Sequence, residues 1–354
     1  MSHAIPISSA NQTGKKNTPP AYRLSVAPMM DLTDRHCRYF HRQISQHTLL
    51  YTEMITTGAL LHGDIERHLA YNDEEHPVAL QLGGSEPKDL AKCAKLGADY
   101  GYNEINLNCG CPSNRVQKGA FGACLMKEPD LVADCVSAMK DIVDIPVTVK
   151  CRIGVDDQED YQSLLDFAGK LADRKVDSLT VHARKAWLEG LSPKQNREIP
   201  PLQYDLVYQL KSDLPNLPII INGGIETISQ AQEHLNILDG VMIGRSAYYN
   251  PWILAEVDAR IFNTIDNQNC VAKDEFDLVE KMYPYIDRQL TQGIKLAAVS
   301  RHLLGLFTGQ PGARQFRRVI SESAHLPGAG VEVIENALAQ IKSIQQKVFE
   351  SKLA

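Results

Sequence analysis

Eight short β-rich runs recur between residues 24 and 245, and this recurrence constrains the fold more than any other feature of the chain. Most of the runs are largely apolar, as in strands buried on both faces of a parallel sheet. The segments between the runs carry apolar residues at helical spacing. The runs are 24–28, 49–54, 77–84, 104–110, 147–152, 178–184, 218–224 and 240–245.

Strict alternation of strands and helices predicts an α/β fold, a parallel (β/α)8 TIM barrel. A doubly wound open sheet is the alternative. We prefer the barrel because polar residues and glycines cluster at the carboxyl ends of the predicted strands, where barrel active sites are built.

The β-type runs stop after Pro251-Trp252, and the remaining chain has helical spacing only. We expect four helices, over 276–290, 296–307, 314–323 and 331–349, forming a small C-terminal helical bundle domain. The predicted organisation is a disordered tail at 1–20, the barrel at 21–262, a linker at 263–273 and the bundle at 274–354.

Composition excludes several classes of protein. No run of eighteen apolar residues is present, and the first twenty residues lack the apolar stretch of a signal peptide, so we expect a cytoplasmic protein with no membrane span. The 8 cysteines are too sparse for a disulfide framework and show no paired CxxC spacing. We therefore expect reduced thiols and no structural metal.

Charge is segregated along the chain. The formal net charge of −6 argues against a nucleic-acid partner, yet residues 291–321 hold five basic residues and no acidic one. Residues 256–288 reverse this balance, with eight acids against four bases. One basic face on an acidic protein is typical of a protein that binds nucleic acid locally.

Two glycine-containing turns follow the seventh and eighth predicted strands, where barrels bind phosphate through backbone amides. They read Asn222-Gly223-Gly224 and Gly244-Arg245. A single glycine pair is most often a tight turn, but two such turns at the two expected strand ends predict a site for a phosphorylated cofactor or substrate.

The other strand ends carry amides, thiols and a cation. The fourth run ends in Asn-Leu-Asn-Cys-Gly-Cys-Pro, where Cys109 is read as a buried small residue and Cys111, on the loop, as a possible general acid. Lys150 and His182 end the fifth and sixth runs. Lys150 faces either a ligand or a carboxylate, Glu104 or Glu53.

Together these groups match a flavin mononucleotide. The two glycine turns suit its phosphate, Gln81 and Lys150 suit its ring edge, and Pro28, Met29 and Met30 offer an apolar shelf. A cation stabilises the negative charge that the reduced ring carries. No GxGxxG fingerprint is present, so we expect no dedicated nicotinamide-binding domain, and a nicotinamide cofactor would bind only transiently.

Several longer motifs resemble the flavin-dependent tRNA-dihydrouridine synthases. The most specific is NLNCGCPSNRVQKGAFGACLM at 106–126; the others are VAPMMDLTDRHCR at 26–38, VKCRIG at 149–154, VHAR at 181–184, INGGI at 221–225 and MIGRSAYYNPW at 242–252. The stretches 186–202 and 301–318 resemble the A subfamily in particular.

The resemblance implies roles for individual residues. Cys111 is implied as the proton donor in the reduction of the C5=C6 bond of uridines around position 20/20a of the tRNA D-loop, with NADPH as the transient donor that reduces FMN. The implied FMN-binding residues are Pro28, Met29, Met30, Gln81, Lys150, His182, Asn222, Gly223, Gly224, Gly244 and Arg245. The implied RNA contacts are Asn108, Lys194, Arg197, Arg314 and Arg317.

Three other functions remain open at this point. A free-pyrimidine oxidoreductase resembling the dihydroorotate dehydrogenases would leave the basic helices without a role. A non-enzymatic RNA-binding protein would not need Cys111. A phosphate-binding aldolase-type barrel would use Lys150 as a Schiff-base nucleophile.

Overall fold

The computed structural model describes residues 19–113, 119–158, 161–264 and 271–353. Most of the predicted tail (1–20) and the central part of the predicted linker (263–273) lie outside the described residues. Within the described residues, no helix is long and apolar enough to span a membrane.

The strands form one closed parallel sheet. Its order is β2-β1-β9-β8-β7-β6-β5-β4-β3, and a further pairing of β2 with β4 closes the barrel. The strands are β1 (Leu24–Val26), β2 (Leu49–Tyr51), β3 (Ile55–Thr56), β4 (Val78–Gly83), β5 (Glu104–Asn108), β6 (Val147–Arg152), β7 (Ser178–His182), β8 (Ile219–Asn222) and β9 (Gly240–Ile243). Closure confirms the (β/α)8 barrel and rules out the open sheet.

Each of the eight predicted runs contains one strand of the closed barrel, but the sheet has a ninth member among the described residues. This is β3, which pairs with the end of β4 through Ile55 and Thr56 alone. The sequence analysis missed it because two residues are too few to show a strand periodicity.

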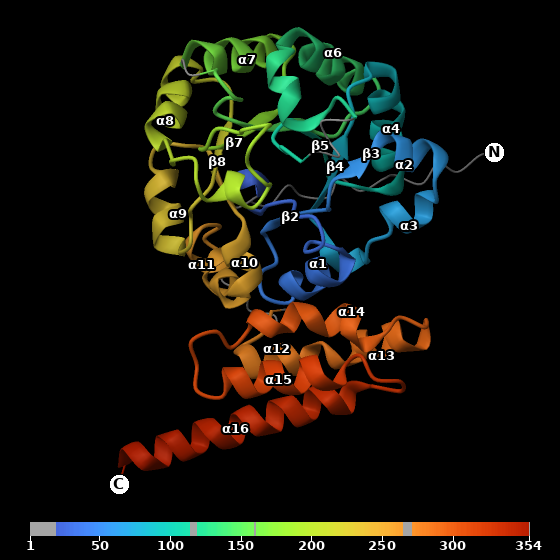
Figure 1. The fold of residues 1–354 in the computed structure, drawn as a ribbon, viewed down its shortest axis with the longest axis vertical. Coiled ribbons are helices and arrows are strands. Elements are labelled where there is room, and N and C mark those ends of the chain that lie inside the picture. Colours follow the sequence, from blue (N-terminus) through green and yellow to red (C-terminus); the bar gives the residue numbers. More distant parts are fainter. Residues whose placement is uncertain (1–18, 114–118, 159–160, 265–270, 354) are drawn as a thin grey trace, which may run out of the picture.

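Helices surround the strands as a ring, which Figure 1 views along the barrel. They are α1 (Arg35–Arg42), α2 (Thr57–His62), α3 (Ile65–Leu69), α4 (Pro87–Tyr100), α6 (Pro129–Lys140), α7 (Tyr161–Asp173), α8 (Tyr204–Asp213), α9 (Ile228–Leu235), α10 (Arg245–Tyr249) and α11 (Val257–Arg260). Local signals set their ends: α4 begins with a proline in its first turn and ends at Gly101, whose φ of 106° few other residues adopt.

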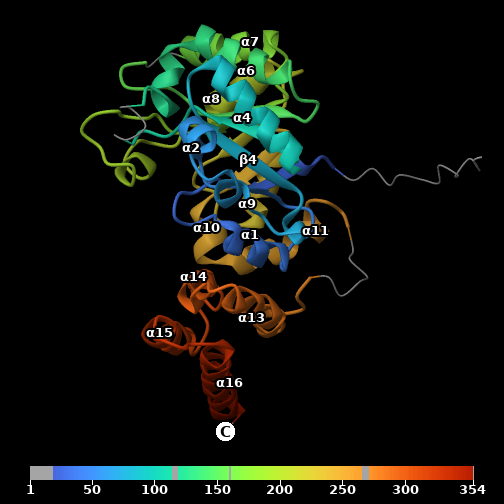
Figure 2. The ribbon, with the colours of Figure 1, turned by 90° about the vertical axis from the view of Figure 1, so that its right-hand side faces the viewer.

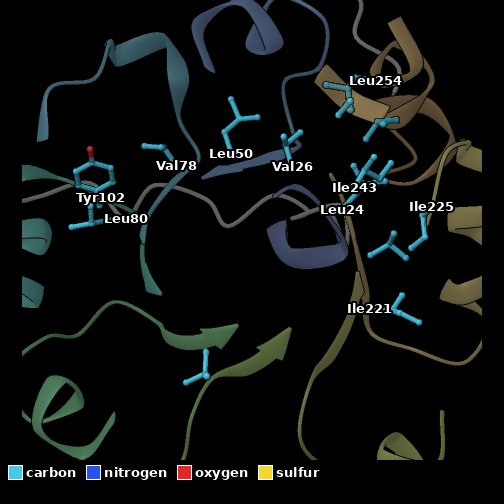
Figure 3. Packing of buried hydrophobic residues seen from close by; sticks show 14 of the residues in the cluster. Leu24, Val26, Leu50, Val78, Leu80, Tyr102, Ile221, Ile225, Ile243 and Leu254 are labelled. Atoms are coloured by element: carbon cyan, nitrogen blue, oxygen red, sulfur yellow. The ribbon is translucent and has the colours of Figure 1, made fainter. Parts of the chain in front are cut away.

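Two apolar clusters flank the barrel wall. The large one fills the layer between strands and helices, and Figure 3 shows Leu24 and Val26 of β1 beside Ile243 of β9. The small one consists of Ala27, Leu49, Tyr51, Ala79, Ile220 and Met242. Because side chains alternate along a strand, these residues face the opposite way, into the barrel interior. The small cluster leaves interior space that polar side chains fill.

The C-terminal region is helical, as expected, but its segmentation differs from the prediction. Its elements are α12 (Glu275–Lys281), α13 (Tyr283–Thr291), α14 (Leu296–Ser300), the 3-10 turn η6 (Arg301–Gly305), α15 (Ala313–Ser323) and α16 (Val331–Leu353). The single helix predicted over 276–290 is broken at Met282, because Pro284 has no N–H to continue the first helix.

The helix predicted over 296–307 is likewise shorter than expected. It ends as η6, where Gly305 packs against the barrel so closely that a Cβ would lie 2.7 Å from the carbonyl oxygen of Tyr249. This close contact leaves no room for a side chain at position 305.

The C-terminal helices pack under α1, as Figures 1 and 2 both show. The rings of Tyr39 and Tyr285 stack with centroids 3.8 Å apart, and the Tyr285 hydroxyl lies 2.6 Å from His36 Nδ1. Asp34, which caps α1, also accepts hydrogen bonds from Arg301 at 2.5 Å and from His302 at 3.1 Å. An ion-paired contact therefore joins the barrel to the C-terminal helices.

Candidate active site at the barrel mouth

The carboxyl ends of the strands bring the predicted site residues together at one end of the barrel. Strand register places Asn108 beside Lys150, and His182 beside both Arg152 and Asn222. Gln81 lies near the end of β4, and Gly223-Gly224 and Gly244-Arg245 follow β8 and β9 directly. Arg314 and Arg317 lie elsewhere, on α15.

Lys150 donates to an amide and not to a carboxylate. Its Nζ lies 3.0 Å from Asn222 Oδ1, and Asn222 Nδ2 in turn donates to the Met242 carbonyl at 2.8 Å. Glu104 accepts instead from Tyr51 and Thr148. The alternative of a Lys150–Glu104 pair is therefore wrong.

The second suggested carboxylate, Glu53, accepts a hydrogen bond from the backbone of Asp31. No hydrogen bond or ion pair joins it to Lys150 among the described residues. Burial, and to a lesser degree the nearby Arg152, lowers the pKa of Lys150 to about 8. An ammonium so placed is stabilised when an anionic or polar ligand binds beside it.

Positive charge dominates the mouth. The Arg152 guanidinium reaches the carbonyls of Gly110, Lys185 and Asn196, each at 2.9 Å. Burial, followed by the charges of Arg152 and Lys150, holds the pKa of His182 well below its usual range, so this imidazole is neutral at pH 7. Arg245 forms an ion pair with Glu198 at 2.8 Å. Such a cationic, partly buried mouth suits an anionic ligand.

The glycine turns fit a phosphate group. Gly223 and Gly224 have φ angles of 112° and 71°, a region that side chains rarely allow. A Cβ on Gly223 would lie 2.6 Å from His182 Cδ2, whereas one on Gly244 would meet nothing within 4 Å. The first turn thus requires glycine for its shape, and the second leaves its backbone open to a ligand. These residues, with Lys150, fit a phosphorylated flavin.

Gln81 differs from the expectation. The sequence suggested Gln81 for the edge of a flavin ring, with its amide free to bind it, but each amide atom already has a protein partner: Nε2 donates to Asn106 Oδ1 and Oε1 accepts from Asn108 Nδ2, both at 2.8 Å. The second hydrogen of Gln81 Nε2 and the second lone pair of its Oε1 remain available for a ligand. Asn108, predicted to contact RNA, is buried and directed into the same network.

The two cysteines of the turn after β5 have different environments. Cys109 is fully buried, and burial raises the pKa of its thiol far above the usual value. Cys111 is half-buried, its N–H donates to Asn108 Oδ1 at 3.0 Å, and its thiol lies 3.6 Å from Ser113 Oγ. Lys150 and Arg152 both interact electrostatically with the Cys111 thiol. Cys111 is therefore the thiol that faces the cationic mouth.

The predicted apolar shelf after β1 is only partly buried. The Met29 N–H donates to Thr33 Oγ1 at 3.0 Å, and its side chain packs against both apolar clusters. Met30 is 50% exposed, so it is not a core residue. Pro28 is half-buried beside them.

The predicted RNA contacts other than Asn108 lie on the surface in two places. Lys194 and Arg197 are exposed at the short helix η4 (Gln195–Arg197), between β7 and α8. Arg314 and Arg317 are exposed on α15, whose opposite face buries Phe316 and Ile320. In Figure 2 the yellow-green segment between β7 and α8 and helix α15 both project toward the left side of the molecule. The two backbone segments that carry these basic residues thus lie on one side of the molecule in this view.

Several residues of the barrel mouth and interior have contacts that the sequence did not predict. Arg152 holds the Cys111 turn through the Gly110 carbonyl, and Glu104, Asn106 and Thr148 hydrogen-bond inside the barrel. A signal for them exists: polar residues at 104, 106 and 108 alternate within an otherwise apolar strand, which places them on one face.

A closed parallel barrel with a cationic mouth and a half-buried thiol beside it has the architecture of a (β/α)8-barrel enzyme, and the charge of the mouth suits an anionic ligand. Residues 25–345 match the family described as Dihydrouridine synthase (Dus). The chain belongs to this family, whose members are oxidoreductases. The resemblance noted in the sequence is confirmed.

Several relatives are similar over nearly the whole chain. Proteins named tRNA-dihydrouridine(20/20a) synthase from Vibrio parahaemolyticus serotype O3:K6 and from Yersinia pestis are 61% and 59% identical, covering 90% and 91% of this chain and 97% and 92% of their own. The protein of that name from Escherichia coli (strain K12) is 60% identical over 89% of this chain and 90% of its own.

Among solved structures, a 2-naphthoyl-CoA reductase in complex with 2-naphthoyl-CoA has a similar fold. Its TM-score is 0.51 at 13% identity, over 66% of this chain and 49% of that chain. This similarity supports the fold alone.

Proposed function

We propose that this protein is a tRNA-dihydrouridine(20/20a) synthase that reduces the C5=C6 bond of D-loop uridines to 5,6-dihydrouridine, with bound FMN, NADPH as hydride source and Cys111 as proton donor. The relatives that are about 60% identical over some 90% of the chain bear this name. The observation that carries the proposal is the half-buried Cys111 thiol beside the cationic barrel mouth.

Each group of the mouth has a task in this reaction. The turns at Gly223-Gly224 and Gly244-Arg245 would bind the FMN phosphate, and Lys150, held by Asn222, would lie at the ring. FMN, when bound, supplies the hydride that uridine receives at C6. Lys150 stabilises negative charge at the site, and neutral His182 adds no competing charge.

Cys111 completes the addition. Hydride at C6 leaves enolate charge conjugated with the C4 carbonyl of uracil, and C5 then needs a proton. The Cys111 S–H donates it, at a position beside the charges of Lys150 and Arg152. Asn108 and Arg152 keep the turn in place through the Cys111 N–H and the Gly110 carbonyl.

The substrate must present an unstacked base to the barrel mouth. The exposed Lys194 and Arg197 beside the mouth, and Arg314 and Arg317 on α15, offer cations to the RNA backbone on one side of the molecule. We propose that the C-terminal helices of 274–354 bind the tRNA while the barrel performs the reaction.

The experiment is mass mapping of an unmodified tRNA transcript after incubation with the purified protein, FMN and NADPH. We expect a gain of two hydrogens per reduced base, confined to D-loop uridines at 20 and 20a. A transcript with cytidine at those positions is the matched control and gains nothing. Reduction of free uracil or orotate without reduction of tRNA would support the free-pyrimidine alternative, and absence of flavin binding would refute the proposal.

A further inference from the structure

Five polar side chains fill the part of the barrel interior that the small apolar cluster leaves, and the hydroxyl of Tyr51, itself a member of that cluster, joins them as a sixth group. They come from four neighbouring strands, β2, β4, β5 and β6, and none is more than 8% exposed. Three of them are alternate residues of β5. The six are Tyr51, Gln81, Glu104, Asn106, Asn108 and Thr148.

These side chains form a continuous chain of hydrogen bonds below Cys111. At the mouth, the backbone N–H groups of Gly110 and Cys111 donate to Asn108 Oδ1 at 3.1 and 3.0 Å. Backbone N–H groups can only donate, so Asn108 must turn its oxygen toward them. Its Nδ2 then donates to Gln81 Oε1 at 2.8 Å.

The chain continues in the same direction to the barrel interior. Gln81 Nε2 donates to Asn106 Oδ1, and Asn106 Nδ2 donates to Thr148 Oγ1, both at 2.8 Å. The Thr148 hydroxyl, whose oxygen already accepts, donates to Glu104 Oε1 at 2.6 Å. Tyr51 donates to the same oxygen at 2.5 Å but is not a link of the chain.

Both ends of this chain resist reversal. The N–H groups at the mouth cannot accept, and Glu104 Oε1 accepts from two hydroxyls at once. If any amide between the two ends exchanged the positions of its oxygen and nitrogen, two oxygens or two N–H groups would face each other. Each buried polar group left without a hydrogen bond in this way costs free energy. The two ends therefore select one orientation for the amides of Asn106, Gln81 and Asn108.

We propose that Thr148 and Glu104 are positioning residues that hold the amide of Gln81 and the Asn108–Cys111 turn in the orientation the reaction needs. They act from inside the barrel, through Asn106, without touching the ligand. The inference rests on the proposed function, because Gln81 is expected at the FMN ring and Cys111 at the base. The inference also explains why this barrel contains a polar column, the hydrogen-bonded chain from Asn108 to Glu104, where a barrel interior is ordinarily apolar.

Thr148→Val is the decisive variant, because it keeps the shape of the side chain but removes the link between Asn106 and Glu104. Thr148→Ser restores the hydroxyl. Tyr51→Phe is the matched control, since it removes an equally buried hydrogen bond to the same Glu104 oxygen without breaking the chain. Should Thr148→Val not fold, Glu104→Met removes the terminal acceptor and Glu104→Gln keeps it.

Three readouts separate positioning from a merely structural role. They are the dissociation constant and visible absorption spectrum of bound FMN, the alkylation rate of Cys111 by iodoacetamide mapped by mass spectrometry, and kcat against KM for tRNA. We expect Thr148→Val to weaken FMN binding and to lower kcat by about tenfold each, to alter the flavin spectrum and the alkylation rate, and to leave KM for tRNA unchanged. Thr148→Ser should restore all of these.

Equal behaviour of Thr148→Val and Tyr51→Phe in these readouts, even with lowered melting temperatures, would overturn the inference. Failure of the proposed function gives a different result, namely a wild-type protein that binds no FMN or reduces no tRNA. The alkylation of Cys111, measured without flavin, still tests the positioning in that case.

Discussion

Single residues at the barrel mouth owe their chemistry to their surroundings rather than to their type. Cys109 and Cys111 lie two positions apart, yet burial removes the first from reaction and the turn presents the second to a cationic mouth. Lys150 has no carboxylate partner among the described residues, and its contact with Asn222 leaves its charge for a ligand.

Replacement of Cys111 by alanine should abolish proton donation while leaving ligand binding intact. We expect dihydrouridine formation to fall by about 10²- to 10⁴-fold, the usual contribution of a general acid, with unchanged affinity for FMN and tRNA. Single-turnover mass mapping of tRNA measures the rate. Cys124→Ala, at the other half-buried thiol of the described chain, is the control and should retain activity. A fully active Cys111→Ala would remove the thiol from the mechanism.

Lys150→Met should stabilise the ligand-free protein and impair the reaction. The pKa of Lys150 is lowered from 10.5 to about 8, so below pH 8 the folded protein carries this charge at a cost that the unfolded chain avoids. We expect a gain of about 2 kcal/mol at pH 7, measured by urea unfolding.

The gain from Lys150→Met should shrink as pH rises from 8 toward 10.5, because the wild-type lysine then loses its proton in the folded state. If the increase in unfolding free energy did not vary with pH, its cause would be better packing of methionine and not the removed charge. Unchanged turnover would contradict the role of the ammonium at the ring.

Among the elements, helix α15 has one buried apolar face and one exposed basic face. Its apolar residues face the other C-terminal helices, and Arg314 and Arg317 are exposed with no ion-pair partner among the described residues. Arg318 differs, because it pairs with Glu322 at 3.0 Å.

Replacing Arg314 and Arg317 together by alanine should weaken tRNA binding and reduce the magnitude of the slope of log K against log salt concentration by about 2. Filter binding over a range of salt concentrations measures this slope. Arg318→Ala should leave it nearly unchanged, since that guanidinium is already paired. An equal slope in the double variant and the wild type would place the RNA on another surface.

Helix α1 joins the two parts of the molecule through its N-cap. Burial alone would raise the pKa of Asp34, but hydrogen bonds from His302, from the Cys37 N–H and from Arg301 hold it well below its usual range. Asp34 thus remains charged and links the start of α1, which follows Pro28, Met29 and Met30 closely in the chain, to η6.

Asp34→Asn preserves the helix cap but removes the charge that Arg301 and His302 require. We expect a loss of about 1–2 kcal/mol in unfolding free energy and faster hydrogen exchange in α13 and η6. Asp64→Asn, at the cap of α3, is the control, because among the described residues the Asp64 side chain accepts a hydrogen bond from the Arg67 N–H alone. Equal rates of hydrogen exchange in α13 and η6 in the two variants would show that the contact of Asp34 with Arg301 and His302 does not hold the C-terminal helices on the barrel.

For the whole molecule, the polar column in the barrel makes stability depend on pH through Glu104. Burial raises the pKa of this carboxyl from 4.5 to about 7, against the opposing hydrogen bonds from Thr148 and Tyr51. The folded protein keeps a proton that the unfolded chain loses, so this contribution is present below pH 4.5 and is lost as pH rises through 7.

Glu104→Gln cannot titrate and should remove this dependence. Relative to the wild type, its unfolding free energy should rise by about 2–3 kcal/mol between pH 5 and pH 8. Urea unfolding across this range measures the difference, with Glu86→Gln, at an exposed position before α4, as control. A constant difference would mean that Glu104 is ionised in the fold at both pH values.

The eight runs and their spacing were enough to predict a parallel α/β fold, because parallel strands buried on both faces leave a local pattern that needs no partner to be recognised. The preference for a closed barrel over an open sheet came from the polar residues and glycines at the strand ends. Motifs around Cys111 and the glycine turns pointed to the family for the same reason, since each is contiguous in sequence. The resemblance also supplied the RNA contacts, which remain predictions.

Contacts between distant segments were decided only by the tertiary structure. Lys150 donates a hydrogen bond to Asn222, 72 positions away in the sequence, and Arg301 donates one to Asp34, 267 positions away. The hydrogen-bonded chain inside the barrel joins side chains from several strands, and Gly305 packs so closely on Tyr249 that a Cβ would clash there. Local periodicity says which face of an element is buried, but strand register and packing determine what each buried group meets there.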